Sequence, residues 1–99
     1  MTSARRRRLV AYDICDPARL RQVAKVCEAH GYRIQLSVFV CDLTPRELFD
    51  FKVRLLDHLN QRVDRVAIFD LGPANEPFDQ RAEILGTGSW SPPTGSQIL

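Results

Sequence analysis

Asp13 is the residue of this sequence whose type and position most clearly point to chemistry. It follows Leu-Val-Ala-Tyr inside the apolar run from Leu9 to Cys15, whose residue types favour a buried strand that Asp16-Pro17 then stops. A carboxylate is costly to desolvate, so Asp13 should lie at the strand's end, meet a cation or bind a metal ion. The structural alternative is an acid at a strand end that accepts hydrogen bonds from the following turn.

A single carboxylate makes a poor magnesium site, because Mg²⁺ is usually held by one or two carboxylates together with water and substrate phosphate. In a two-fold dimer, the Asp13 carboxylates of two copies could hold one hydrated Mg²⁺. Such an ion could activate water and polarise a phosphodiester, with arginines stabilising the charge on the phosphate. Asp16 is better explained as the N-cap of a helix.

The basic residues close to Asp13 in the sequence are candidates for phosphate contact, because a guanidinium group can bind phosphate through two hydrogen bonds. Residues 1–41 contain eight Arg or Lys and three Asp or Glu, a net charge of +5, whereas residues 42–99 contain six and nine, a net charge of −3. The alternative for each arginine is a solvated surface charge. The candidates are Arg19, Arg21 and Arg33, and the run Arg5 to Arg8 could bind phosphates or form a flexible tail.

Length and composition exclude several classes of protein. A chain of 99 residues has room for one domain with a marginal core, so oligomerisation is expected. Its apolar runs are shorter than the ~18 residues of a membrane span, and no secretory signal follows Arg5 to Arg8, so we expect a cytoplasmic protein without membrane contact. The three cysteines lack C-x-x-C spacing, which argues against a disulfide framework and a zinc knuckle.

The order of expected elements is β-α-β-β-α-β, with a possible short fifth strand, which predicts an α+β ferredoxin-like sandwich. Two helices would cover one face of an antiparallel sheet. We expect Phe39 on the other face, covered by a second copy of the chain in a homodimer. The predicted elements are strands at 9–15, 32–41 (broken near Gln35 to Ser37), 63–71 and 81–86, and helices from Asp16-Pro17 to Gly31 and from Thr44 to near Asn60. The predicted domain covers residues 9–86, between a flexible basic tail at 1–8 and a flexible tail at 87–99.

Three motifs together resemble the CRISPR-associated protein 2 family. They are Tyr12-Asp13-Ile14, then Asp16-Pro17-x-Arg19-Leu20-Arg21, then Gly31-Tyr32-Arg33-Ile34-Gln35-x-Ser37-Val38-Phe39. The resemblance covers roughly residues 9–72. The sequence departs from the family pattern at Leu36, where an aromatic or polar residue is frequent, and at Val40, which replaces an acidic or polar residue.

This resemblance implies a ferredoxin-like homodimer of the spacer-acquisition stage, a Mg²⁺-dependent endonuclease that acts on RNA in some members and on double-stranded DNA in others. It also implies a DNA-binding partner of the CRISPR-associated integrase. Asp13 would bind the metal and act in catalysis. The matching positions for activity or its support are Tyr12, Ser37 and Phe39 in the catalytic site and Arg19, Arg21 and Arg33 in nucleic-acid binding.

Two other functions remain open from the sequence. One is a non-catalytic architectural adaptor in the integrase complex, for which the basic N-terminal half would suffice. The other is a ferredoxin-like RNA-binding or regulatory module, which would require paired aromatic residues on neighbouring strands, where only Phe39 is well placed. His30 is a further candidate, as a proton carrier.

Overall fold

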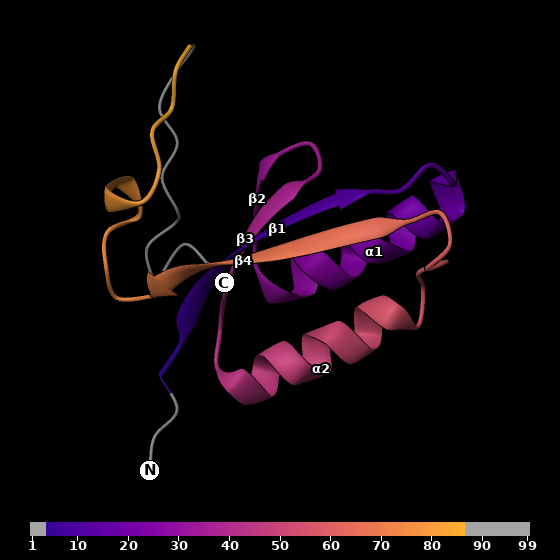
Figure 1. Cartoon of the computed structure of the whole chain (residues 1–99), viewed down its shortest axis with the longest axis horizontal. Coiled ribbons are helices and arrows are strands. Elements are labelled where there is room, and N and C mark those ends of the chain that lie inside the picture. The colour runs from indigo at the N-terminus through magenta and orange to yellow at the C-terminus, as the bar shows by residue number, and fades with distance from the viewer. Residues whose placement is uncertain (1–3, 87–99) are drawn as a thin grey trace.

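The computed structural model describes residues 4–86. Two helices cover one face of a four-stranded antiparallel sheet whose strand order is β2-β3-β1-β4 (Figure 1). This confirms the α+β ferredoxin-like arrangement expected from the sequence. The elements are β1 (Arg6–Asp13), α1 (Pro17–His30), β2 (Tyr32–Gln35), β3 (Val38–Leu43), α2 (Pro45–Leu56), β4 (Arg65–Pro73) and the short 3-10 helix η1 (Phe78–Gln80).

Both ends of α1 are determined by local chemistry. The Asp16 carboxylate accepts a hydrogen bond from the backbone N–H of Arg19 at 2.9 Å, so Asp16 is the N-cap that the sequence predicted. The helix ends at Gly31, where a Cβ atom would lie 2.6 Å from the Cys41 Sγ and would collide with the carbonyl oxygen of Val40. Only glycine therefore lets the chain pass this close to β3.

The second helix begins with the predicted capping box. The Thr44 hydroxyl accepts from the backbone N–H of Glu47 at 3.1 Å, and the Glu47 carboxylate accepts from the backbone N–H of Thr44 at 2.9 Å. The α2 helix ends at Leu56, four residues before the predicted end at Asn60. With 14 and 12 residues, neither α1 nor α2 is long and apolar enough to cross a membrane, and no other helix among residues 4–86 is.

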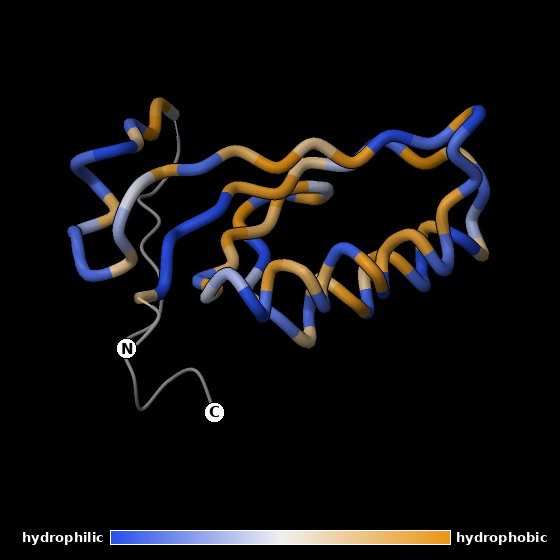
Figure 2. Tube along the Cα trace, turned by 60° about the horizontal axis from the view of Figure 1, so that its bottom comes forward, coloured by the Kyte–Doolittle hydropathy of each residue, from blue (hydrophilic) through white to orange (hydrophobic). Residues whose placement is uncertain are grey.

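The hydrophobic core lies between the helices and one face of the sheet, as the apolar segments in Figure 2 indicate. Phe39 lies in this core, fully buried, opposite Val10 of β1. The prediction that Phe39 occupies the uncovered face was therefore wrong. Strict alternation in a strand separates two faces but does not say which face the helices cover. The aromatic residue that projects most openly from the uncovered face is Phe69 of β4, which is 52% exposed.

The arginine run belongs mostly to the first strand. Because β1 starts at Arg6, residues 6–8 are not part of a flexible tail, and the predicted boundary at residue 9 is three residues late. Each of these arginines has an acidic neighbour on an adjacent strand: Arg6 and Arg8 approach Asp70 of β4, and Arg7 approaches Asp42 of β3. Ion pairs across the sheet thus stabilise a strand whose sequence is otherwise unfavourable.

The segment after β4 differs from the sequence prediction. Residues 81–86 form no strand in the single chain, and the 3-10 helix Phe78–Gln80 precedes them. Two carbonyl oxygens of this segment, those of Ala74 and Glu76, accept hydrogen bonds from the buried Arg7 guanidinium. The predicted tail at 87–99 and residues 1–3 lie outside the described residues.

Candidate functional site

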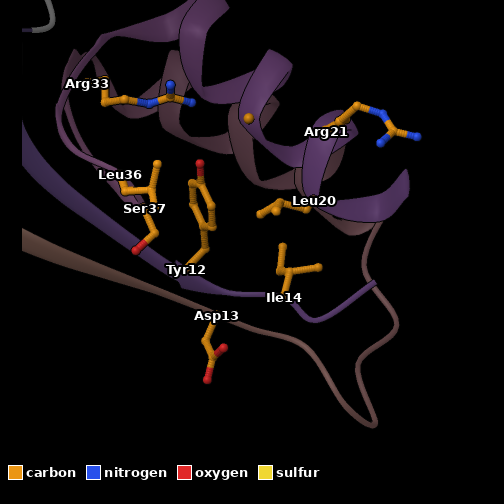
Figure 3. A pocket seen from close by; sticks show the side chains of 9 residues that line it. Tyr12, Asp13, Ile14, Leu20, Arg21, Arg33, Leu36 and Ser37 are labelled. Carbon is orange, nitrogen blue, oxygen red and sulfur yellow. The ribbon is translucent and has the colours of Figure 1, made fainter. Parts of the chain in front are cut away.

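Asp13 lies at the last position of β1, on the sheet face that the helices leave uncovered. Its neighbour Tyr12 packs toward α1, and successive side chains of a strand point to opposite faces. In Figure 3 the Asp13 carboxylate accordingly points away from Tyr12 and from α1. The residue is exposed, and it lies opposite Arg65 of β4 in the strand register. The predicted strand-end carboxylate is therefore available to bind a cation.

A pocket of about 410 Å³ opens beside the end of β1, between α1 and the turn that joins β2 to β3 (Figure 3). Tyr12, Arg21, Arg33 and Ser37 all line it, and Asp13 lies on its rim. Five of the seven predicted site residues thus line this pocket, although the Asp13 carboxylate itself points to the other face of the sheet. The polar residues share the pocket with apolar side chains of Ile14, Leu20, Ala24 and Leu36.

Arg33 is held in position at the pocket by three neighbours. Its guanidinium carbon lies 5.0 Å from the centre of the Phe39 ring, and its Nη2 lies 3.7 Å from a carboxylate oxygen of Glu28. Tyr12 stacks on the same Phe39 ring with 6.1 Å between centroids. Burial raises the pKa of the Tyr12 hydroxyl, while its hydrogen bond to Arg33 opposes that shift. The hydroxyl therefore stays protonated at neutral pH and can donate a hydrogen bond.

Phe39 supports the site without reaching the pocket. Its side chain is fully buried beneath Arg33 and Tyr12, so it cannot touch a substrate. Its predicted place in the catalytic site is better described as positioning. Ser37 contributes a side chain to the pocket wall, and its carbonyl oxygen accepts a hydrogen bond from the Tyr12 backbone N–H at 3.1 Å. That bond ties the β2–β3 turn to the end of β1.

Arg19 and Arg21, two residues apart on α1, differ sharply in their surroundings. The Arg19 guanidinium forms two hydrogen bonds with the carboxylate of Asp64, at 2.7 and 3.2 Å, and Arg19 does not line the pocket. Arg21 is exposed at the pocket and has no hydrogen bond or ion pair within residues 4–86. Arg21 is thus free to bind phosphate, whereas the Arg19 guanidinium is already bound to Asp64 within the fold. Asp64 was missed from the sequence because it lies 45 residues from Arg19.

Residues 6–76 match the model of the family described as CRISPR associated protein Cas2. The chain belongs to the Cas2 family. This confirms the resemblance drawn from the three sequence motifs, and it extends the matched region to the arginine-rich start of β1.

Among the relatives, the Cas2 protein of Rhodospirillum rubrum named "CRISPR-associated endoribonuclease Cas2 1" is 42% identical over 78 residues, which cover 79% of this chain and 76% of the relative. The Thermus thermophilus protein named "CRISPR-associated endonuclease Cas2 2" is 37% identical, with 80% of each chain covered. The crystal structure of Streptococcus pyogenes Cas2 superposes with a TM-score of 0.70 at 41% identity, covering 81% of this chain and 99% of that one. This Cas2 structure shares the fold described above.

The site of this Cas2-family chain offers one carboxylate to a metal ion. Within residues 4–86, no three His, Cys, Asp or Glu side chains cluster closely enough to hold a metal. The nearest acid along the chain, Asp16, is occupied as the helix cap. Asp13 is exposed and could supply one ligand to a hydrated divalent cation, and a second copy could supply another. A single chain thus offers one carboxylate ligand, and the expectation that two copies share the metal ion stays a prediction.

Proposed function

We propose that this chain is a Mg²⁺-dependent endonuclease of the CRISPR spacer-acquisition stage, which hydrolyses phosphodiester bonds at Asp13. The observation that carries the proposal is the exposed Asp13 carboxylate beside a pocket whose cations are Arg21 and Arg33. The names of the relatives, endoribonuclease and endonuclease, support nuclease activity and leave RNA and double-stranded DNA as the substrates to compare.

Each residue of the site would have a distinct role in cleavage. Asp13 would hold Mg²⁺, which when bound supplies a Lewis acid at a phosphoryl oxygen. Arg21 would bind the phosphate through its free guanidinium, and Arg33, fixed by Phe39 and Glu28, would add a second positive charge. Tyr12 would donate a hydrogen bond from a hydroxyl that stays protonated.

A homodimer formed through the uncovered sheet face supports this proposal. That face carries apolar side chains in cross-strand register, with Leu9 between Val40 and Phe69, and Ala11 between Val38 and Ala67. Phe69 is 52% exposed there, and the same face carries Asp13 at the end of β1. Val40 is already buried in the single chain, so pairing two such faces would bury chiefly Phe69 and would bring two Asp13 carboxylates into one assembly.

The direct test compares Asp13→Asn with Asp79→Asn, a matched change at another exposed aspartate. Asp13→Asn should abolish Mg²⁺-dependent cleavage of RNA and duplex DNA, and EDTA should abolish it in the wild type. Circular dichroism should show both variants folded. Cleavage by purified Asp13→Asn at the wild-type rate would refute the nuclease proposal.

The second candidate is an architectural adaptor that binds DNA and the CRISPR-associated integrase without cutting. The observation that favours it is a pair of exposed cations, Arg21 and Lys25, four residues apart on α1 and without a hydrogen bond or ion pair within residues 4–86. A spacer-acquisition assay separates the two functions. Full acquisition by Asp13→Asn would favour the adaptor, and failure equal to that of a deletion would favour the nuclease.

A further inference from the structure

The Asp13 carboxylate and the cations of the pocket lie on opposite faces of the sheet. Arg21 and Arg33 line the pocket beside α1, whereas the Asp13 carboxylate points away from it in Figure 3. A phosphate bound beside Asp13 would therefore be stabilised most directly by a cation on the uncovered face. On that face, the residue directly opposite Asp13 is Arg65, the first residue of β4.

The strand register places Arg65 next to Asp13. Residues directly opposite each other in an antiparallel pair project from the same face of the sheet, with Cβ atoms about 4.5–5.5 Å apart. Both residues are exposed. Within residues 4–86, neither side chain forms a hydrogen bond or an ion pair. The carboxylate and the guanidinium are therefore both available to a ligand on this face.

The surface beside this pair has small side chains. The next cross-strand pair on the same face is Ala11 of β1 with Ala67 of β4, and the exposed Phe69 projects one pair further along β4. The face is therefore low next to Asp13 and Arg65, which leaves room there for a phosphodiester.

The fold fixes the backbone from which Arg65 projects. The residue before it is Asp64, whose carboxylate is fully buried and accepts hydrogen bonds from the Arg19 guanidinium at 2.7 and 3.2 Å. The same carboxylate accepts from the backbone N–H of Asn60 at 2.9 Å. The start of β4 is thus attached to the first turn of α1, beside the end of β1.

We propose that Arg65 is a further catalytic residue of the Asp13 site, which binds a non-bridging oxygen of the scissile phosphate. The inference rests on the proposed nuclease function, because it adds a residue to the same site. Hydrolysis forms a P–O bond to water and breaks the P–O bond to the leaving oxygen, which takes up a proton. Negative charge on the non-bridging oxygens must be stabilised during this exchange, and a guanidinium can do so through two hydrogen bonds. The alternative is a surface cation that only neighbours Asp13 across the strands.

The first test measures cleavage at saturating Mg²⁺ and substrate. Arg65→Ala should lower the rate about a hundredfold. Arg65→Lys should have an intermediate rate, because it keeps the charge and loses the paired hydrogen bonds. Arg54→Ala is the matched control: Arg54 is exposed on α2, has no hydrogen bond or ion pair within residues 4–86, and should leave the rate unchanged. All three variants should melt at the wild-type temperature, because an exposed side chain without partners is replaced in each.

The second test measures binding without cleavage. It uses the full chain carrying Asp13→Asn in EDTA, where neither a metal ion nor the Asp13 charge is present. The probe is the RNA or the duplex DNA of the nuclease test, whichever this protein binds more tightly. Adding Arg65→Ala should reduce the slope of log affinity against log salt by about one, because one phosphate contact is lost. Adding Arg54→Ala should leave the slope unchanged.

Two results would overturn the inference: cleavage by Arg65→Ala at the wild-type rate while Asp13→Asn is inactive, or an unchanged salt slope when Arg65→Ala is added. Either result would leave the proposed nuclease intact. Absence of cleavage by the wild type would remove the proposed nuclease, and the salt slope would then decide whether Arg65 binds phosphate.

Discussion

The Nε of Arg19 lies 2.7 Å from the Oδ2 of Asp64, a carboxylate whose side chain is fully buried. The same oxygen accepts a hydrogen bond from the backbone N–H of Asn60 at 2.9 Å. The pair connects the first turn of α1 to the segment between α2 and β4, which are far apart in the sequence. Arg19 therefore stabilises the fold, whereas Arg21, two residues further along α1, is exposed and available to a ligand.

This difference predicts opposite phenotypes for two arginine-to-alanine changes on one helix. Arg19→Ala should lower the melting temperature, because it leaves the Asp64 carboxylate buried without its cation. Arg21→Ala should leave the melting temperature unchanged and should reduce the slope of log affinity against log salt for nucleic acid by about one. Thermal unfolding by circular dichroism and a salt series of binding titrations measure the two effects. A stable Arg19→Ala variant that fails to bind would contradict this assignment.

The pair also predicts a pH dependence of stability. The hydrogen bond from Arg19 lowers the pKa of Asp64 below its ordinary value of about 3.9. A carboxylate with a lowered pKa contributes stability that is fully present above the unfolded value and is lost as the pH falls through the folded value. The free energy of unfolding of the wild type, measured in urea, should therefore fall steeply below about pH 4. In Arg19→Ala the free energy of unfolding should decline less steeply over the same pH range. An identical pH dependence in the two proteins would show that the Arg19–Asp64 pair does not cause it.

Arg7 makes a separate prediction about the segment that follows β4. Its guanidinium, with a side chain only 8% exposed, donates to Asp42 at 3.1 Å and to the carbonyl oxygens of Ala74 and Glu76 at 2.8 and 2.9 Å. Arg7→Ala should cost about 3 kcal/mol in the free energy of unfolding, because it leaves these acceptors unpaired.

Trypsin should also cut Arg7→Ala faster after Arg81, since the segment would lose its attachment to β1. Arg6→Ala is the control, because Arg6 is exposed and, within residues 4–86, its ion pair is with the exposed Asp70 alone. Its loss of stability in urea unfolding should be clearly smaller. Equal losses for the two variants would show that burial of Arg7 is not what matters.

The sequence predicted features that depend on neighbouring residues. The helix starts at Asp16 and at Thr44 with Glu47, and the break between β2 and β3, all follow from local capping and alternation. These features position Tyr12, Ser37 and Arg33, so most of the candidate site could be assembled from motifs.

The features that the sequence missed depend on contacts between distant residues. The partner of Arg19 is 45 positions away, and Arg6 pairs with Asp70 across 64 positions. Four consecutive arginines have no strand pattern of their own, so nothing local indicated that β1 starts at Arg6. The burial of Phe39 was likewise decided by which face the helices cover.

The cysteines predict a simple chemical result. Burial raises the pKa values of Cys27 and Cys41 to about 12, whereas Cys15 is exposed. A thiolate is the reactive form, so at pH 8 only about one in ten thousand of the buried thiols is ionised. A thiol reagent should modify one group rapidly in the native chain and all three in denaturant, and Cys15→Ser should remove the rapid reaction. Fast labelling of Cys15→Ser would contradict the burial of the other two.

The uncovered sheet face predicts how the oligomeric state responds to a single charge. Phe69 on this face and Phe49 on α2 are exposed to similar extents, 52% and 62%, so the same substitution can be compared at both. Phe69→Asp would place an unpaired carboxylate in the proposed dimer interface and should weaken association about a hundredfold. Phe49→Asp should leave association unchanged.

Sedimentation velocity over a range of concentrations measures this difference. Cleavage should fall together with dimerisation in Phe69→Asp, because the proposed metal site needs an Asp13 from each copy. Phe49→Asp should retain both dimer and cleavage. Dissociation caused by Phe49→Asp and not by Phe69→Asp would place the interface on α2, and a fully active Phe69→Asp monomer would show that one Asp13 is sufficient.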